Sequence, residues 1–119
     1  MSHPIVALFR RPPRPSAADL IARSSRLVEV EGVDNPANVG SIVRNAAALG
    51  WDGLLLDHTS ADPLSRRALR VAMGTAFSIA HARTTSLVDE LRAVTDRHLY
   101  SLTPDPTATD IRSVAAGIQ

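Results

Sequence analysis

The sequence predicts an α/β domain in which helices flank a parallel sheet. Apolar runs at 27–33, 53–57, 78–82 and 99–102 have the length and the aliphatic or β-branched content of strands. Segments with helical periodicity separate these runs, so strands alternate with helices at least three times. Right-handed crossovers then bring ligand groups to the edge of the sheet where the parallel strands end.

The bulk composition limits the class of protein further. A chain of 119 residues that is 45% hydrophobic, with two Phe, one Trp and one Tyr, predicts one domain with an aliphatic core. No apolar run approaches the ~20 residues that span a bilayer, and the N-terminus lacks a secretion signal, so we expect a cytoplasmic protein with no membrane partner. The chain has no cysteine, which excludes disulfides, and its net charge of +1 gives no global argument for nucleic acid.

All thirteen basic residues are arginine. Planar guanidinium groups suit phosphate recognition, but the codon usage of a GC-rich genome also favours arginine, and the even distribution along the chain fits that explanation. Residues 1–15 form a Pro/Arg-rich arm or linker, because Arg-Arg-Pro-Pro-Arg-Pro at 10–15 cannot be the interior of a helix. Arg10 and Arg11 are candidates for contact with an RNA backbone, and a solvated linker is the alternative.

The first half of the expected domain contains two helices and two strands. A helix over 16–26 follows Ser16 as a cap, and Glu29 and Glu31 in the strand at 27–33 indicate a polar face or an edge position. Asn35 suits the cap of a longer helix at 36–49, whose first position is Pro36. Gly50 suits the left-handed residue that ends this helix, and a strand over 53–57 follows.

The second half continues the alternation with shorter elements. We expect a helix from 62 to 73, a strand over 78–82, a helix over 86–95 capped by Ser86, and a strand over 99–102. The tail from 107 onward has weak periodicity.

The helix at 36–49 separates apolar from polar side chains. Its expected buried stripe is Val39, Ile42, Val43, Ala46 and Ala47. Asn38, Arg44 and Asn45 fall well away from that stripe on a helical wheel. The polar groups that follow the first strand are therefore presented to solvent at the edge of the sheet.

The stretch from Asp34 to Ala47, Asp-Asn-Pro-Ala-Asn-Val-Gly-Ser-Ile-Val-Arg-Asn-Ala-Ala, resembles the first motif of the SpoU (TrmH-type) RNA ribose 2′-O-methyltransferases. These enzymes belong to the SPOUT superfamily. The resemblance implies the Rossmann-like front half of a trefoil-knot catalytic domain, S-adenosylmethionine as the methyl donor, ribosomal or transfer RNA as the substrate, and a homodimer.

The resemblance also implies roles for individual residues. The motif arginine aligns with Arg44, where a guanidinium group lowers the pKa of the attacking 2′-hydroxyl or holds the adjacent phosphate. The motif asparagines align with Asn35 and Asn38 around the reacting ribose; for Asn35 a plain helix cap is the alternative, and for Arg44 a solvated helix face. The segment 62–74 is similar to the family as well. Its candidate contacts to phosphate or to a second subunit are Arg66, Arg67 and Arg70, with a charged outer helix face as the alternative.

Two later motifs of the family, which hold the cofactor, have no match from Tyr100 onward. We therefore expect the resemblance to cover about 27–105, with 16–119 a partial methyltransferase domain that lacks the C-terminal knot region. Residues that bind the cofactor stay unassigned. His3, His58, His81 and His98 have no spacing typical of metal ligands, so no metal is expected.

Two other functions compete with the enzyme. The first is a non-enzymatic RNA-binding or protein-interaction module derived from the same fold, and the second is a Rossmann-like domain with an unrelated small ligand. The reading frame beyond Gln119 discriminates between the enzyme and the first alternative. Continuation into a Glu-Gly loop favours the enzyme, whereas a stop codon favours the module.

Overall fold

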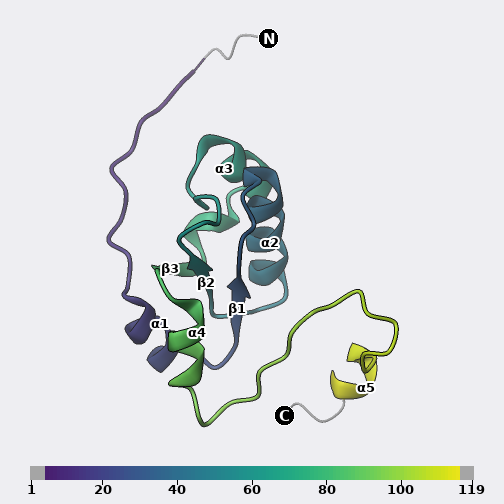
Figure 1. Cartoon of the computed structure of the whole chain (residues 1–119). Helices are drawn as coiled ribbons and strands as arrows, with labels where there is room; N and C mark the ends of the chain where they lie inside the picture. The colour runs from purple at the N-terminus through teal and green to yellow at the C-terminus, as the bar shows by residue number, and fades with distance from the viewer. Residues whose placement is uncertain (1–4, 116–119) are drawn as a thin grey trace.

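A computed structural model describes residues 5–115, and a three-stranded parallel sheet lies at its centre (Figure 1). The strands lie side by side in the order β1 (Leu27–Val30), β2 (Gly53–Asp57) and β3 (Ala80–Thr84). Leu27 pairs with Gly53, and Gly53 pairs with Ala80, so the three strands begin and end at nearly the same level. All the loops that follow the strands therefore meet at one edge of the sheet.

Helices cover both faces of this sheet, as Figure 1 shows. One layer consists of α2 (Pro36–Ala48), α3 (Arg66–Ala72) and the 3-10 helix η1 (Thr75–Phe77). The other layer consists of α1 (Ala17–Arg23) and α4 (Leu87–Arg92). A last helix, α5 (Ile111–Ala115), follows a long irregular segment and lies apart from the sheet.

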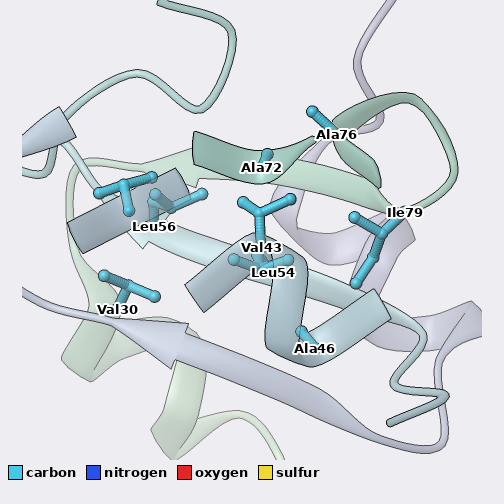
Figure 2. Packing of buried hydrophobic residues seen from close by; sticks show 9 residues of the cluster. Val30, Val43, Ala46, Leu54, Leu56, Ala72, Ala76 and Ile79 are labelled. Carbon is cyan, nitrogen blue, oxygen red and sulfur yellow. The ribbon is translucent and has the colours of Figure 1, made fainter. Parts of the chain in front are cut away.

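Successive residues of β2 pack against opposite helical layers. Leu54 and Leu56 pack toward α2, where Val43 lies over Leu54 in Figure 2. Leu55, between them, packs with Leu20 of α1 and Leu87 of α4. Every residue of β2 is buried, which is the burial expected of a central parallel strand with helices on both sides. This sheet confirms the predicted α/β architecture.

The elements nearest the motif agree best with the sequence prediction. The strand at 53–57 and the helix from Pro36 are confirmed, with Asn35 as the N-cap and Gly50 in the left-handed region at φ 75°. Ser16 and Ser86 also cap α1 and α4 as predicted. The first strand ends early, at Val30, because the chain turns at Gly32 with φ 65°. It is an edge strand of the described sheet, where Glu29 is half-buried and burial raises its pKa.

Several predicted boundaries were wrong. The third helix begins at Arg66 and not at 62, because Asp62–Ser65 form a separate turn in which the Asp62 carboxylate accepts from the Leu64 amide at 2.8 Å. The third strand is Ala80–Thr84 and not 78–82, since Ser78 belongs to the end of η1. The predicted strand at 99–102 is absent. Its Leu99 and Leu102 are 54% and 83% exposed, and a strand without a neighbouring strand or burial has nothing to stabilise it.

The predicted arm precedes α1 and has no helix or strand over its described part, 5–15. Residues 1–4 and 116–119, including His3 and the end of the predicted partial domain, lie outside the described residues. Within 5–115 no helix is long and apolar enough to cross a membrane.

Candidate functional site

The polar residues of the motif lie at the start and on the outer side of α2. The Asn35 side-chain oxygen accepts from the Ala37 amide at 2.9 Å, so Asn35 fixes where the helix begins. Asn38 and Arg44 are exposed, and within the described chain neither side chain takes part in a hydrogen bond or an ion pair. Both are available to a ligand, whereas the oxygen of Asn35 already serves the helix.

Gly40 brings α3 against α2. A Cβ atom at Gly40 would lie 2.5 Å from the carbonyl oxygen of Ala68 and 3.0 Å from the Cβ of Val71, so only glycine allows the two helices to pack this closely. Ala37, Gly40 and Arg44 follow one another at i, i+3 and i+7 and share one side of α2. Since Gly40 faces α3, Arg44 lies on the side of α2 that borders α3.

The charged side chains within α2 and α3 are all positive. Ala37 of α2 and Arg66, Arg67, Arg70 and Val71 of α3 line a surface hollow of about 530 Å³. Together α2 and α3 contain four arginines and no Asp or Glu. We call Asn35, Asn38, Arg44, Arg66, Arg67 and Arg70 the motif surface. The structure thus places the predicted arginines of α3 beside the first turn of the motif helix, whereas Arg10 and Arg11 lie elsewhere, on the arm.

Asp57 holds the loop that leads into the motif helix. Its carboxylate, buried at the end of β2, accepts from the Gly32 amide at 3.0 Å and from the Ser60 hydroxyl at 2.6 Å. It also accepts from the amide and hydroxyl of Thr59 and from the Ser60 amide. Burial raises the pKa of Asp57, but these hydrogen bonds outweigh burial and keep the pKa well below its ordinary value. Asp57 is therefore a carboxylate that positions the motif loop and not a proton donor.

Ser60 and Arg83 complete this support. The Ser60 hydroxyl accepts from the Val33 amide at 3.2 Å, and the Ala61 amide donates to the Val33 carbonyl at 2.8 Å. Arg83 of β3 donates to the Ser60 carbonyl at 2.8 Å and, over longer distances, to the carbonyls of Asp57, His58 and Ala61. These contacts link the loop after β1 to the loop after β2. They therefore hold in place the loop from which the motif helix α2 begins.

The sequence alone did not predict these supporting residues. Asp57 was visible as the end of an apolar strand, and Asp followed by Thr and Ser two and three positions later is a signature of side-chain-capped turns. A glycine inside a helical pattern likewise indicates close packing, which is the role of Gly40. Nothing in the local sequence indicates Arg83, whose partners lie more than twenty residues away.

Histidines do not form a metal centre in the part of the chain that the structure describes, where no group of three His, Asp or Glu side chains converges. His58 is exposed beside the loop after β2. His81 of β3 is buried, and its Nε2 has no hydrogen-bond partner among residues 5–115.

A family model decides which family the chain belongs to. The model of the SpoU rRNA methylase family matches residues 25–117, which include the three strands, α2 and α3. The chain belongs to the SpoU rRNA methylase family. The resemblance of the motif is thereby confirmed over a longer stretch than the motif itself.

Relatives of known name agree with this family. An uncharacterized tRNA/rRNA methyltransferase of Mycobacterium bovis is 36% identical over 96% of this chain, which corresponds to 40% of that protein. The 23S rRNA guanosine 2′-O-methyltransferase RlmP of Bacillus subtilis is 35% identical over 61% of the chain and 30% of RlmP. The chain thus spans less than half the length of these curated SpoU relatives.

Solved structures share the fold. An AdoMet-bound rRNA methyltransferase from Sinorhizobium meliloti matches with a TM-score of 0.61 and 31% identity, over 68% of this chain and 32% of that one. The SpoU methyltransferase AviRb of Streptomyces viridochromogenes, in complex with AdoMet, matches with a TM-score of 0.58 and 28% identity, over 67% of this chain and 32% of that one. Both matches fit a partial SPOUT domain.

Proposed function

We propose that this chain is the RNA-facing part of an RNA ribose 2′-O-methyltransferase, and that the motif surface binds the substrate RNA. The observation that carries the proposal is the charge of the α2–α3 pair, which has four arginines and no carboxylate although the whole chain has a net charge of only +1. Phosphodiester groups are the natural partners of such a surface. The SpoU family and the named action of RlmP on a ribose 2′-oxygen support the reaction class.

We assign to Arg44 the contact with the reacting ribose. A guanidinium group stays protonated, because its pKa exceeds ~12, so Arg44 does not remove the proton of the hydroxyl. A positive charge beside the 2′-oxygen instead stabilises the negative charge that develops during attack, and the same fork holds the neighbouring phosphate. Asn38 lies on the exposed side of the first helical turn as a second polar contact, and Asn35 positions both by fixing the start of α2.

S-adenosylmethionine is the methyl donor that the family implies. Three arginines line each of the two hollows, whereas an adenosyl site is lined mostly by apolar and aromatic side chains, so neither hollow has the lining of a donor site. We therefore assign this chain's residues to RNA and to the reacting ribose, and none of them to the donor. A homodimer and a cytoplasmic place of action belong to the proposal as properties expected of the family.

The test is the chemical position of the transferred methyl group. The gene's whole product is incubated with methyl-labelled S-adenosylmethionine and unmodified ribosomal or transfer RNA, and the RNA is then hydrolysed in alkali. Because a 2′-O-methyl group blocks alkaline cleavage, the proposal predicts label in alkali-resistant dinucleotides.

Two results would contradict the proposal. Label in mononucleotides would mean methylation of a base, and RNA binding with no transfer of label would favour the non-enzymatic module, for which the arginine-rich lining of both hollows is the supporting observation.

A further inference from the structure

A second basic hollow lies between the N-terminal arm and the sheet. Its volume is about 480 Å³, and three of its seven lining residues are arginines, from the arm and from β3. We call it the arm hollow; it is lined by Arg11, Pro12, Arg14, Ser60, Asp62, Leu64 and Arg83. It shares no lining residue with the motif surface, and no residue of the motif stretch at 34–47 contributes to it.

The floor of the arm hollow is rigid. Arg83 is held by carbonyl oxygens of the loop after β2, four of which accept from its guanidinium group. Ser60, which also lines the hollow, is buried and bonded to Asp57. A guanidinium group bonded only to neutral carbonyls keeps its whole positive charge, so the floor attracts an anion.

The wall of the arm hollow is the proline segment. In an extended Pro-rich segment with about three residues per turn, side chains three positions apart recur on the same side, about 9 Å apart. Arg11 and Arg14 have this spacing and both line the hollow. Arg11 pairs with Asp62 at 2.7 Å, which anchors the arm and leaves three guanidinium groups facing one carboxylate.

The arginines of the arm hollow also affect a buried neighbour, His81. His81 lies two residues before Arg83 on β3, and its Nε2 has no hydrogen-bond partner in the described part of the chain. Burial lowers the pKa of His81, and the charges of Arg14, Arg83 and Arg11 lower it further, while Asp62 opposes them. An anion in the hollow would offset this mutual repulsion.

The lining of the arm hollow comes within two residues of the motif surface along the chain. Leu64 lines the arm hollow, and Arg66, two residues later, lines the hollow beside α2. We propose that the arm hollow binds a backbone phosphate of the same RNA strand that the motif surface holds, with Arg11, Arg14 and Arg83 as its ligands. This inference rests on the proposed function, and it assigns to Arg14 and Arg83 a contact that the sequence analysis did not predict. Two basic hollows whose linings come this close along the chain suit a polymer of phosphates better than a single free anion.

The test measures binding of fluorescein-labelled oligouridylate to the whole chain over a range of salt concentrations. The double variant Arg11→Gln/Arg14→Gln removes two guanidinium groups from the arm hollow. Its matched control, Arg23→Gln/Arg92→Gln, removes two exposed charges from α1 and α4 on the other layer. We expect ~10-fold weaker binding for the first variant and wild-type binding for the second. The slope of log K against log salt should fall by about 1.4 for two lost contacts to a single strand.

Asp62→Asn separates phosphate binding from anchoring of the arm. An asparagine keeps the acceptor for the Leu64 amide but releases Arg11 and removes the only carboxylate of the hollow. If the hollow binds phosphate, this variant binds oligouridylate more tightly than the wild type. If the ion pair serves only to hold the arm, the variant binds more weakly, and the proposal is contradicted.

Two further outcomes distinguish this inference from the proposed function. If Arg11→Gln/Arg14→Gln binds like the wild type while Arg66→Gln/Arg67→Gln binds more weakly, the arm hollow is not an RNA contact but the motif surface is. If neither pair weakens binding, both proposals fail. A last measurement is titration with inorganic phosphate. If Arg11→Gln/Arg14→Gln loses phosphate binding but keeps oligouridylate binding, the arm hollow is a small-anion site and the assignment to RNA is overturned.

Discussion

The two helical layers cover the same sheet but differ in charge. Each layer buries one side of β2: Leu54 and Leu56 face α2, and Leu55 faces α1 and α4. The α1–α4 layer carries acidic and basic residues together, whereas α2 and α3 carry four arginines and no carboxylate. The apolar sides therefore determine the fold, and the outer side of one layer alone is suited to bind an anion.

Paired core substitutions test whether the layers contribute equally to stability. Leu54→Ala and Leu55→Ala each remove a fully buried side chain, one from each face of β2. Each should lower the free energy of unfolding by about 2–5 kcal/mol, because each leaves a cavity under a helix. Urea denaturation measures both. A loss confined to one variant would show that one layer contributes little to the fold.

The close contact at Gly40 lies between the two helices of the α2–α3 layer. Gly40→Ala places a methyl group against the Ala68 carbonyl, and the backbone must move to admit it. We expect a loss of about 1–3 kcal/mol, although alanine has the better helix propensity. The control is Ser41→Ala on the exposed side of the same helix, where the change should stay within about 0.5 kcal/mol. Equal stability of Gly40→Ala and wild type would contradict the close packing of α2 against α3.

Asp57 links stability to pH. Its lowered pKa means that its contribution is complete above the pKa of the unfolded chain, about 4, and is lost as the pH falls through the lower pKa of the folded protein. Asp57→Asn turns an amide toward the hydroxyl and amide donors, so we expect a loss of about 1–3 kcal/mol at neutral pH.

That difference from the wild type should shrink as the pH falls below about 4, because the carboxylate of the unfolded chain then takes up a proton while the folded one stays ionised down to its own, lower pKa. Urea denaturation at neutral and acidic pH measures it, with exposed Asp96→Asn as the control. A difference that stays constant down to strongly acidic pH would exclude the ionised carboxylate as the group that holds the loop.

Local sequence was sufficient to predict the parts of this fold that depend on local signals. The cap at Asn35, the strand at 53–57 and the left-handed Gly50 follow from residue type and periodicity, and the structure has all three. The segment 99–102 has the same local signals but no neighbouring strand to pair with. Strand pairing, and not residue propensity, therefore determined that it is not a strand.

The residues of the candidate site also fall into two groups, those that local sequence predicted and those that it did not. Arg44 and the α3 arginines could be predicted, because each lies within one continuous stretch of sequence that resembles the family. Gly40 and Arg83 act through Ala68 and the carbonyls of 57–61, contacts between distant segments that no pattern in one sequence specifies. Charge shows the same limit: the net charge of +1 gave no sign that α2 and α3 together contain four arginines and no Asp or Glu.

The most direct test of the difference between the layers is methyl transfer by the gene's whole product with one arginine removed from each. Arg44→Ala removes the exposed guanidinium of α2, and Arg92→Ala removes an exposed guanidinium of α4. We predict that Arg44→Ala lowers kcat by about 10²–10³-fold with unchanged thermal stability, since it removes charge stabilisation at the reacting oxygen, and that Arg92→Ala transfers methyl groups at the wild-type rate. Equal activity of the two variants would contradict the assignment of the reacting ribose to the motif surface.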